Sequence, residues 1–154
     1  EMQEKMYELQ PSADAISMAA AIVDLRVPGG GDPFKIDKNS LINSFNEKLE
    51  LVPDLLLSLQ KGKPNGQVII GFTALTGSDE EIQKQAAIKL QNKKCDLLMA
   101  NPIDRPGQGF ELDTNGGWLL SSTDPIQPIE VKSKLELAHQ LLDEMLQKRK
   151  SLMK

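Results

Sequence analysis

The amino-acid sequence predicts an α/β fold in which a mainly parallel sheet lies between two layers of helices. Three short apolar runs without polar alternation, at residues 15–23, 67–73 and 96–100, are typical of strands buried on both faces. Two longer segments with helical periodicity begin at Ser78 and Ser133, each with a glutamate three residues later, which is the pattern of a capping box. Because strands that alternate with helices usually pair in parallel, we expect a three-layer domain.

Composition limits the classes of protein to consider. The chain has 154 residues, which suits one domain, and its 40% hydrophobic and 26% charged residues are ordinary for a soluble globular protein. A net charge of −4 argues against non-specific binding of nucleic acid. No apolar run approaches the ~20 residues that span a bilayer, and no signal peptide is visible. A single cysteine, Cys95, excludes a disulfide framework and fits a cytoplasmic protein.

The chain opens with a predicted helix over residues 1–9, in which Met2, Met6 and Leu9 have helical spacing. Because this segment has no initiator methionine, we expect the second half of a longer helix and an incomplete N-terminus; a trimmed natural terminus is the alternative. The first strand, 15–23, ends at Asp24. Ligands bind at the carboxyl ends of strands in open α/β sheets, so Asp24 is a candidate site residue, and a purely structural role is the alternative.

The middle of the chain predicts a long loop followed by shorter elements. Residues 28–33 read Pro-Gly-Gly-Gly-Asp-Pro, and a long glycine- and proline-rich loop is usually a flap or lid, here over roughly residues 27–47. Residues 48–52 alternate between polar and apolar, which predicts a half-exposed strand. Pro53 and Asp54 then open a short helix to residue 60.

The remaining elements follow from periodicity. The helix after Ser78 is expected to bury Ile82, Ala86 and Leu90 and to end near residues 92–94. The strand at 96–100 ends at Asn101, and two further strands are expected at 116–121 and 128–131. The last helix is expected to bury one face, formed by Leu135, Ala138, Leu142 and Met145.

Few residues suggest chemistry on their own. The single histidine, His139, has no second ligand at metal-binding spacing and no serine partner, so it reads as an ordinary helix residue. Cys95 reads as a residue at the start of a strand, and no glycine-rich phosphate loop follows any strand. What remains is Phe72 and Asn101 near strand ends, and Lys89 and Lys93 four residues apart on one helix face. These fit a nucleotide or phosphate site, and the lysines equally fit a solvated helix face.

Several segments together resemble one family. Residues 18–26 read Met-Ala-Ala-Ala-Ile-Val-Asp-Leu-Arg, residues 71–76 read Gly-Phe-Thr-Ala-Leu-Thr, and residues 109–115 read Gly-Phe-Glu-Leu-Asp-Thr-Asn. With Lys35-Ile36-Asp37-Lys38, residues 51–56 and residues 89–101, these motifs resemble, in the same order, those of bacterial phosphopantothenate–cysteine ligase. That enzyme is the C-terminal half of a bifunctional coenzyme A biosynthesis flavoprotein. The resemblance implies a Rossmann-like sheet and extends over nearly the whole chain.

The resemblance also implies a reaction and a set of residues. The family joins 4′-phosphopantothenate to cysteine, using CTP and Mg²⁺ to form an acyl-cytidylate. Lys35 on the flap and Asn101 are the implied catalytic residues. The implied nucleotide contacts are the backbone of Met18, Ala19 and Ala20 at the base, Pro53, Asp54, Leu55 and Leu56 at the base and ribose, and the side chains of Asp24, Lys35, Phe72, Lys89 and Lys93. A homodimer and a fused or associated flavin-dependent decarboxylase domain are the implied partners.

The sequence also departs from the family pattern. Asp37 replaces a flap lysine, Leu75 replaces a glutamate, and Pro102 stands where an aspartate usually follows Asn101. The family's glycine-rich strand–turn–helix and its Asn-x-Ser-Ser-Gly segment have no counterpart in these residues. We therefore expect a C-terminal part of a ligase domain with little activity alone. The alternative is a nucleotide-binding or dimerising module without catalysis.

Overall fold

The computed structural model describes residues 1–26, 49–109 and 111–153. It divides into two compact units, one formed by Glu1–Ala19 with Leu56–Lys154 and a smaller one formed by Ala20–Leu55. The predicted flap, 27–47, lies outside the described residues. Among the described helices, none is both long and apolar enough to cross a bilayer.

The larger unit contains a five-stranded sheet with the order β1-β4-β5-β6-β7. Strands β1 (Ala15–Met18), β4 (Val68–Leu75) and β5 (Leu97–Pro102) are parallel. Strands β6 (Thr114–Ser121) and β7 (Gln127–Ser133) continue the sheet antiparallel, since only loops and no crossover helix connect β5 to β6 and β6 to β7. The carboxyl ends of the three parallel strands therefore share one edge of the sheet.

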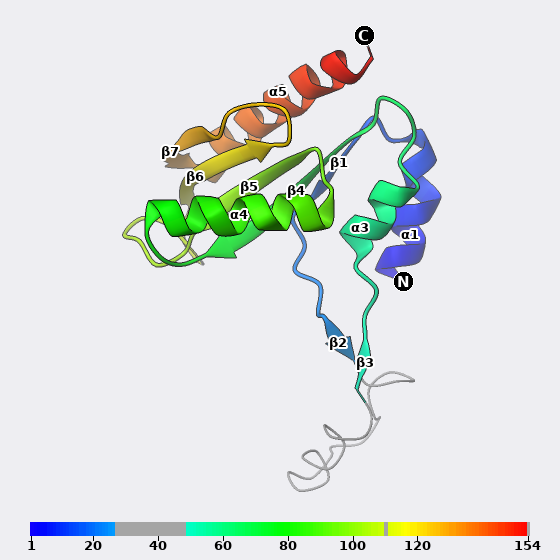
Figure 1. The fold of residues 1–154 in the computed structure, drawn as a ribbon, viewed down its shortest axis with the longest axis horizontal. Coiled ribbons are helices and arrows are strands. Elements are labelled where there is room, and N and C mark those ends of the chain that lie inside the picture. The colour runs from blue at the N-terminus through cyan, green and yellow to red at the C-terminus, as the bar shows by residue number, and fades with distance from the viewer. Residues whose placement is uncertain (27–48, 110, 154) are drawn as a thin grey trace, which may run out of the picture. The chain divides into compact units, whose positions relative to one another are not determined.

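Helices cover both faces of this sheet, as predicted (Figure 1). Side chains alternate along each strand, so Val68, Ile70 and Met99 form the core with α5 (Lys134–Leu152). The intervening residues, such as Ile69 and Leu98, are buried on the opposite face, which α4 (Asp79–Lys93) covers. The three-layer α/β prediction is thus confirmed.

Both long helices begin at the capping boxes that the sequence predicts. At the start of α4, the Ser78 hydroxyl accepts a hydrogen bond from the backbone N–H of Glu81. The Glu81 carboxylate in turn accepts a hydrogen bond from the backbone N–H of Ser78. Ser133 and Glu136 form the same reciprocal pair at the start of α5. The predicted buried face of α4, Ile82, Ala86 and Leu90, is also confirmed.

The predicted buried face of α5 is wrong for Leu135, Ala138 and Leu142, which are exposed, and confirmed only for Met145. The helix buries Leu137, Leu141 and Met145, whereas Leu135 and Leu142 are 70% and 59% exposed. Apolar residues occur on more than one side of this helix, so periodicity alone does not select the side that packs. The contact with the sheet makes that selection.

The first part of the chain packs through polar contacts. Helix α1 (Met2–Leu9) confirms the predicted opening helix, yet it buries no residue. The short 3₁₀ helix after it (Gln10–Ser12) is held by the Gln10 amide, whose Nε2 donates to the carbonyl of Leu59 in α3 (Leu55–Lys61) at 2.7 Å. Gln67 Nε2 in turn donates to the carbonyls of Gln10 and Ala13, so these buried amides satisfy one another.

The strand predicted over residues 15–23 is shorter and less buried than expected. β1 ends at Met18, and only Ile16 and Met18 are buried, because β1 pairs with β4 along four residues and is covered on one face. Asp24 follows in the smaller unit, where its carbonyl accepts the Val52 N–H at 2.8 Å. That unit contains a two-stranded antiparallel ribbon, β2 (Leu25–Arg26) with β3 (Glu50–Leu51). Of the strand predicted at 48–52, residue 48 lies outside the described residues, and within 49–52 the strand is found at Glu50–Leu51.

Candidate functional site

A groove of about 400 Å³ opens at the carboxyl ends of the parallel strands. Its sheet side consists of Ser17, Ala19, Phe72, Asn101 and Asn115, and its helix side of Lys134, Leu137, Ala138, Leu141, Leu142 and Met145. We call it the α5 groove. It is lined mostly by apolar side chains, with amide, hydroxyl and ammonium groups among them.

Asn101 stands at the end of β5, as predicted, and is 8% exposed. Its Nδ2 donates to the carbonyl of Gly116 on β6 at 3.1 Å, which fixes the orientation of the amide at the α5 groove. Two strands thus hold this side chain in place. A rigidly held amide is suited to orienting a ligand, and the catalytic role given to Asn101 stays a prediction.

Phe72 lies beside Asn101 in the same groove. It is half-buried and packs against the core cluster formed by the sheet and α5. Its placement at the predicted edge agrees with the sequence reasoning. An aromatic ring with one side open offers a stacking surface for a flat ligand group.

Lys89 reaches the same edge from the opposite face of the sheet. Its Nζ donates to the Thr73 hydroxyl at 2.8 Å. Thr73 follows Phe72 directly in β4, so the two side chains point to opposite faces. Lys93, four residues on, is half-buried on α4. The predicted site residues of the larger unit therefore form two groups, one beside α5 and one beside α4.

The other predicted nucleotide contacts fall into different parts of the structure. Met18 is buried at the end of β1, Ala19 lines the α5 groove, and Leu56 is half-buried in α3. The smaller unit contains Ala20, Asp24, Pro53, Asp54 and Leu55, and of these only Leu55 is fully buried. Lys35 and the departure at Asp37 lie outside the described residues. Asp24 is not at the end of β1, which corrects that expectation.

Mg²⁺ is the metal ion that the family resemblance implies. Within residues 1–26, 49–109 and 111–153, no three His, Cys, Asp or Glu side chains lie close enough to hold a metal ion. Mg²⁺ usually binds through substrate phosphates and one or two carboxylates, and it keeps several waters. An Mg²⁺ ion that arrives with a nucleotide's phosphates needs no such cluster, so the described residues are compatible with it.

Sequence reasoning missed several residues of this edge. Thr73 positions Lys89, and Ser17, Asn115 and Lys134 line the α5 groove. Asn115 is the last residue of a quoted motif, so the sequence contained a signal for it. Ser17 and Lys134 carry no such signal, because only the packing of α5 on the sheet brings them to the groove.

Two departures from the family pattern are neighbours in the sheet. Leu75 of β4 and Pro102 of β5 are register partners, and both are buried. Both residues are apolar, whereas the family resemblance implies a carboxylate at each of these two positions.

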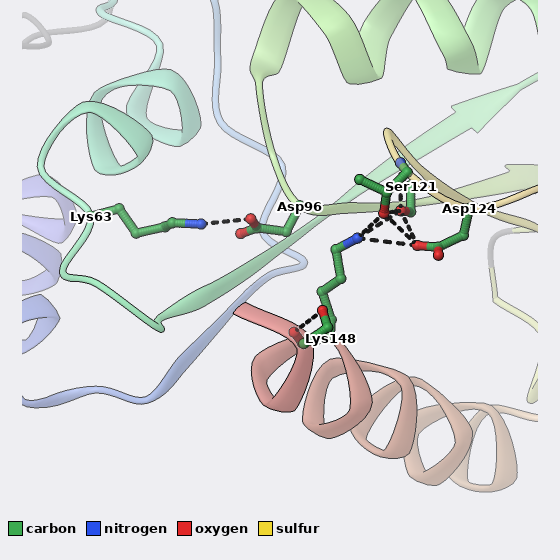
Figure 2. Close-up of polar contacts among 7 residues, drawn as sticks. Lys63, Asp96, Ser121, Asp124 and Lys148 are labelled. Carbon is green, nitrogen blue, oxygen red and sulfur yellow. Dashed lines mark hydrogen bonds and ion pairs between the residues drawn. The ribbon is translucent and has the colours of Figure 1, made fainter. Parts of the chain in front are cut away.

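Other polar clusters lie at the opposite edge of the sheet (Figure 2). The Lys63 ammonium lies 2.6 Å from the Asp96 carboxylate just before β5, and Asp96 also accepts the Ile69 N–H. At the end of β6, hydrogen bonds from the Ser121 and Thr123 hydroxyls and from Lys148 lower the pKa of Asp124 to about 2. These contacts fasten elements together at the end of the sheet away from the groove.

Cys95 confirms the structural interpretation. The thiol is 4% exposed, and burial raises its pKa to about 11, so the unreactive thiol form predominates. His139 is exposed on α5 and lies outside the groove, as expected of an ordinary helix residue.

These features define an α/β domain with a candidate ligand site at the carboxyl edge of its parallel strands. The chain belongs to the family of DNA/pantothenate metabolism flavoprotein C-terminal domains, whose model matches residues 1–148. The family resemblance inferred from the motifs is thereby confirmed.

Individual relatives agree with this assignment. The chain is 34% identical over 141 residues to the coenzyme A biosynthesis bifunctional protein CoaBC of Mycobacterium tuberculosis H37Rv, covering 86% of this chain and 32% of that protein. It is 32% identical over 129 residues to Escherichia coli K12 CoaBC, covering 82% and 30%. The chain thus spans about a third of the relatives it matches.

A solved structure has the same fold. The crystal structure of a CoaBC C-terminal domain superposes with a TM-score of 0.69 at 23% identity, covering 97% of this chain and 64% of that one. The sheet and its flanking helices are therefore those of this domain family.

Proposed function

We propose that this chain provides the nucleotide side of a phosphopantothenate–cysteine ligase. The reaction would activate 4′-phosphopantothenate with CTP and Mg²⁺ as an acyl-cytidylate, which the amine of cysteine attacks. The proposal rests on family membership and on one observation: Phe72 and Asn101 line the same groove beside α5, at the carboxyl ends of the parallel strands. Lys89 lies on the other face of the sheet, where it donates to Thr73.

Each residue has a chemical part in the proposal. Lys89, held by Thr73, presents a positive charge to a triphosphate, and Lys93 on the next turn adds a second. Phe72 offers its ring to the base, and Asn101 orients the activated carboxyl group or its attacker. Met18 and Ala19 would contact the base through their backbone, and Lys35 would close over the intermediate. Stabilising the charge that develops on phosphate oxygens is the main demand of this chemistry.

Calorimetric titration of the chain with Mg²⁺–CTP tests the proposal, with Mg²⁺–ATP as the comparison nucleotide. We expect CTP to bind more tightly than ATP. Lys89→Ala should weaken binding by about tenfold, because it removes a charge-assisted contact. Lys84→Ala is the matched control, since Lys84 is another exposed lysine of the same helix. Equal losses in the two variants would overturn the assignment of Lys89.

Activity requires a separate measurement. We expect little formation of phosphopantothenoylcysteine by residues 1–154 alone, since about a third of the related domain has no counterpart here. Rapid turnover by this chain without additions would contradict that expectation.

A second candidate is a nucleotide-binding module without catalysis. The buried register partners Leu75 and Pro102 favour it, because both are apolar where the family resemblance implies carboxylates. The two functions can be distinguished by fusing to this chain the part of the solved C-terminal domain that has no counterpart here. Activity of the fusion supports the ligase, whereas CTP binding without turnover supports the module.

Partners follow from the same family. The relatives are named as bifunctional proteins. A homodimer and a decarboxylase domain, fused or associated, therefore belong to the proposal. Sedimentation at several concentrations tests the dimer.

A further inference from the structure

Two asparagine side chains of the α5 groove are held by the same residue, Gly116. Asn101, at the end of β5, donates from its Nδ2 to the Gly116 carbonyl at 3.1 Å. Asn115, near the start of β6, accepts the Gly116 backbone N–H with its Oδ1 at 2.9 Å. A carbonyl can only accept and an N–H can only donate, so Gly116 determines which way each side-chain amide is turned.

Each amide retains the atom that Gly116 does not use. Asn101 keeps its Oδ1, an acceptor, and Asn115 keeps its Nδ2, a donor. Within residues 1–26, 49–109 and 111–153, neither atom has a hydrogen-bond partner. Asn101 is only 8% exposed and Asn115 is half-buried, so solvent reaches them poorly. A ligand that supplies one donor and one acceptor would satisfy both atoms.

The backbone around Gly116 is built for this arrangement. The register of β6 with β7 shifts between Asn115 and Gly117, which marks a bulge. Gly117 has a φ of 136°, and a Cβ there would clash with the carbonyl of Ala100. A Cβ on Gly116 would lie 2.9 Å from the carbonyl oxygen of Ile129. Bulges re-aim side chains beside functional sites, and here glycine lets the backbone approach close enough to hold both asparagines.

The remaining lining decides which ligand suits the pair. Among the described residues that line the groove, Lys134 is the one charged side chain, and none is a carboxylate. The ammonium of a free amino acid would therefore have no counter-charge there. Phe72, Leu137 and Leu141 make most of the lining apolar. A neutral amide flanked by alkyl groups fits this lining, and the Lys134 ammonium suits an anionic end of the same molecule.

We propose that Asn101 and Asn115 together bind a secondary amide of the ligand. Its N–H donates to the Asn101 Oδ1, and its carbonyl accepts from the Asn115 Nδ2. This inference rests on the proposed function, in which the ligand is 4′-phosphopantothenate. The amide of that molecule lies two methylene groups from the carboxylate to be activated, so holding the amide directs the carboxylate. Asn115 is thereby a substrate-binding residue, and Gly116 positions both asparagines.

The test titrates pantothenate into the chain without nucleotide and follows the side-chain NH₂ signals of the asparagines by NMR. We expect a saturable shift of the Asn115 signal. Pantothenate methylated on the amide nitrogen should bind at least about tenfold more weakly, because the Asn101 Oδ1 loses its donor. Since CTP is absent, failure of CTP binding leaves this result unaffected. CTP binding without pantothenate binding would overturn this inference and leave the nucleotide site standing.

Matched variants locate the contact. Asn115→Ala removes the donor without adding charge and should weaken pantothenate binding by about fivefold or more. Asn115→Asp keeps the acceptor for the Gly116 N–H but sets a carboxylate against the amide carbonyl, so we expect a loss of at least about tenfold. The control is Asn92→Asp, which adds the same charge at an exposed position of α4 outside the groove. It should change binding less than about twofold. Circular dichroism checks that each variant folds.

Four results would overturn the proposal. The first is no shift of the Asn115 signal in the folded chain up to about 10 mM pantothenate, which would detect affinities far weaker than micromolar. The second is equal binding of pantothenate and its N-methylated analogue. The third is an equal loss for Asn115→Asp and Asn92→Asp. The fourth is a shift of the Asn115 signal by cysteine but not by pantothenate, which would make the groove an amino-acid site.

Discussion

Asp96 has two structural tasks at the start of β5. It pairs with the ammonium of Lys63 at 2.6 Å and accepts the backbone N–H of Ile69 at 2.8 Å (Figure 2). The side chains of Lys63 and Asp96 are only 17% and 10% exposed, so water cannot readily replace this contact when one partner is removed. This pair ties the turn before β4 to the strand that follows α4.

We expect Asp96→Ala to lower the free energy of unfolding by about 3–5 kcal/mol, because it leaves a buried cation and a backbone donor unpaired. Urea denaturation measures the change. The control is Glu8→Ala, which breaks the exposed Lys5–Glu8 pair and should cost less than about 1 kcal/mol. A comparable loss in the two variants would show that burial does not set the strength of the Asp96 contact.

Cys95 provides a test of local burial. Its thiol is 4% exposed, with a pKa raised to about 11 by desolvation. We expect a disulfide reagent at pH 8 to modify it only slowly in the native protein and rapidly in denaturant. Rapid native modification would mean that the start of β5 opens readily.

At the scale of single residues, sequence reasoning identified side chains but not their surroundings. Phe72 and Asn101 lie at the predicted edge, because the strands that contain them were correctly located. Asp24 does not, because β1 ends at Met18, six residues before Asp24. Lys89 lies on the predicted helix, and its bond to Thr73 depends on how α4 crosses the sheet.

At the scale of elements, the capping boxes were predictable because their interactions span three residues. The Ser133 hydroxyl caps α5, and hydrogen bonds from Ser133 lower the pKa of Glu136. The buried face of α5 was not predictable, since the choice between its apolar sides depends on the sheet. The predicted length of β1 was wrong for the same reason, because it also depends on contacts with the rest of the sheet.

We expect Ser133→Ala to lower the free energy of unfolding by about 1 kcal/mol through loss of the N-cap. Glu136→Gln should also destabilise the protein at pH 7. A lowered pKa in the folded state means that the stabilisation is present above the ordinary pKa of glutamate, near 4.5, and is lost as the pH falls through the lowered value.

Urea denaturation at several pH values tests this, with Glu130→Gln as the matched exposed control on β7. The difference between wild type and Glu136→Gln should shrink as the solution becomes acidic. A difference that is independent of pH would contradict the capping role of the Glu136 carboxylate.

At the scale of the whole molecule, the order of elements and the fold class followed from the sequence, because apolar runs and helical periods are local. The division into two units did not. In the described part of the smaller unit, residues 20–26 and 49–55, two residues of β2 pair with two of β3 in a short ribbon. The larger unit contains the extended sheet and its buried core.

We expect hydrogen exchange to separate the two units. Amides of Leu25, Arg26, Glu50 and Leu51 should exchange much faster than those of β4 and β5, because a two-residue ladder opens easily. Mass spectrometry of exchanged peptides measures the difference. Equal protection in both units would show that they unfold together.

Helix α5 contributes Leu137, Leu141 and Met145 to the core that Val68, Ile70 and Met99 begin. Its last turns also hold the first strand region, through Arg149 to Asp14 at 2.6 Å, and the β6–β7 turn, through Lys148 to Asp124. During synthesis the ribosome makes this helix after the strands that it packs against. A nascent chain that has completed its strands therefore still exposes an apolar sheet face. The domain should become resistant to proteases only after α5 has left the ribosomal exit tunnel.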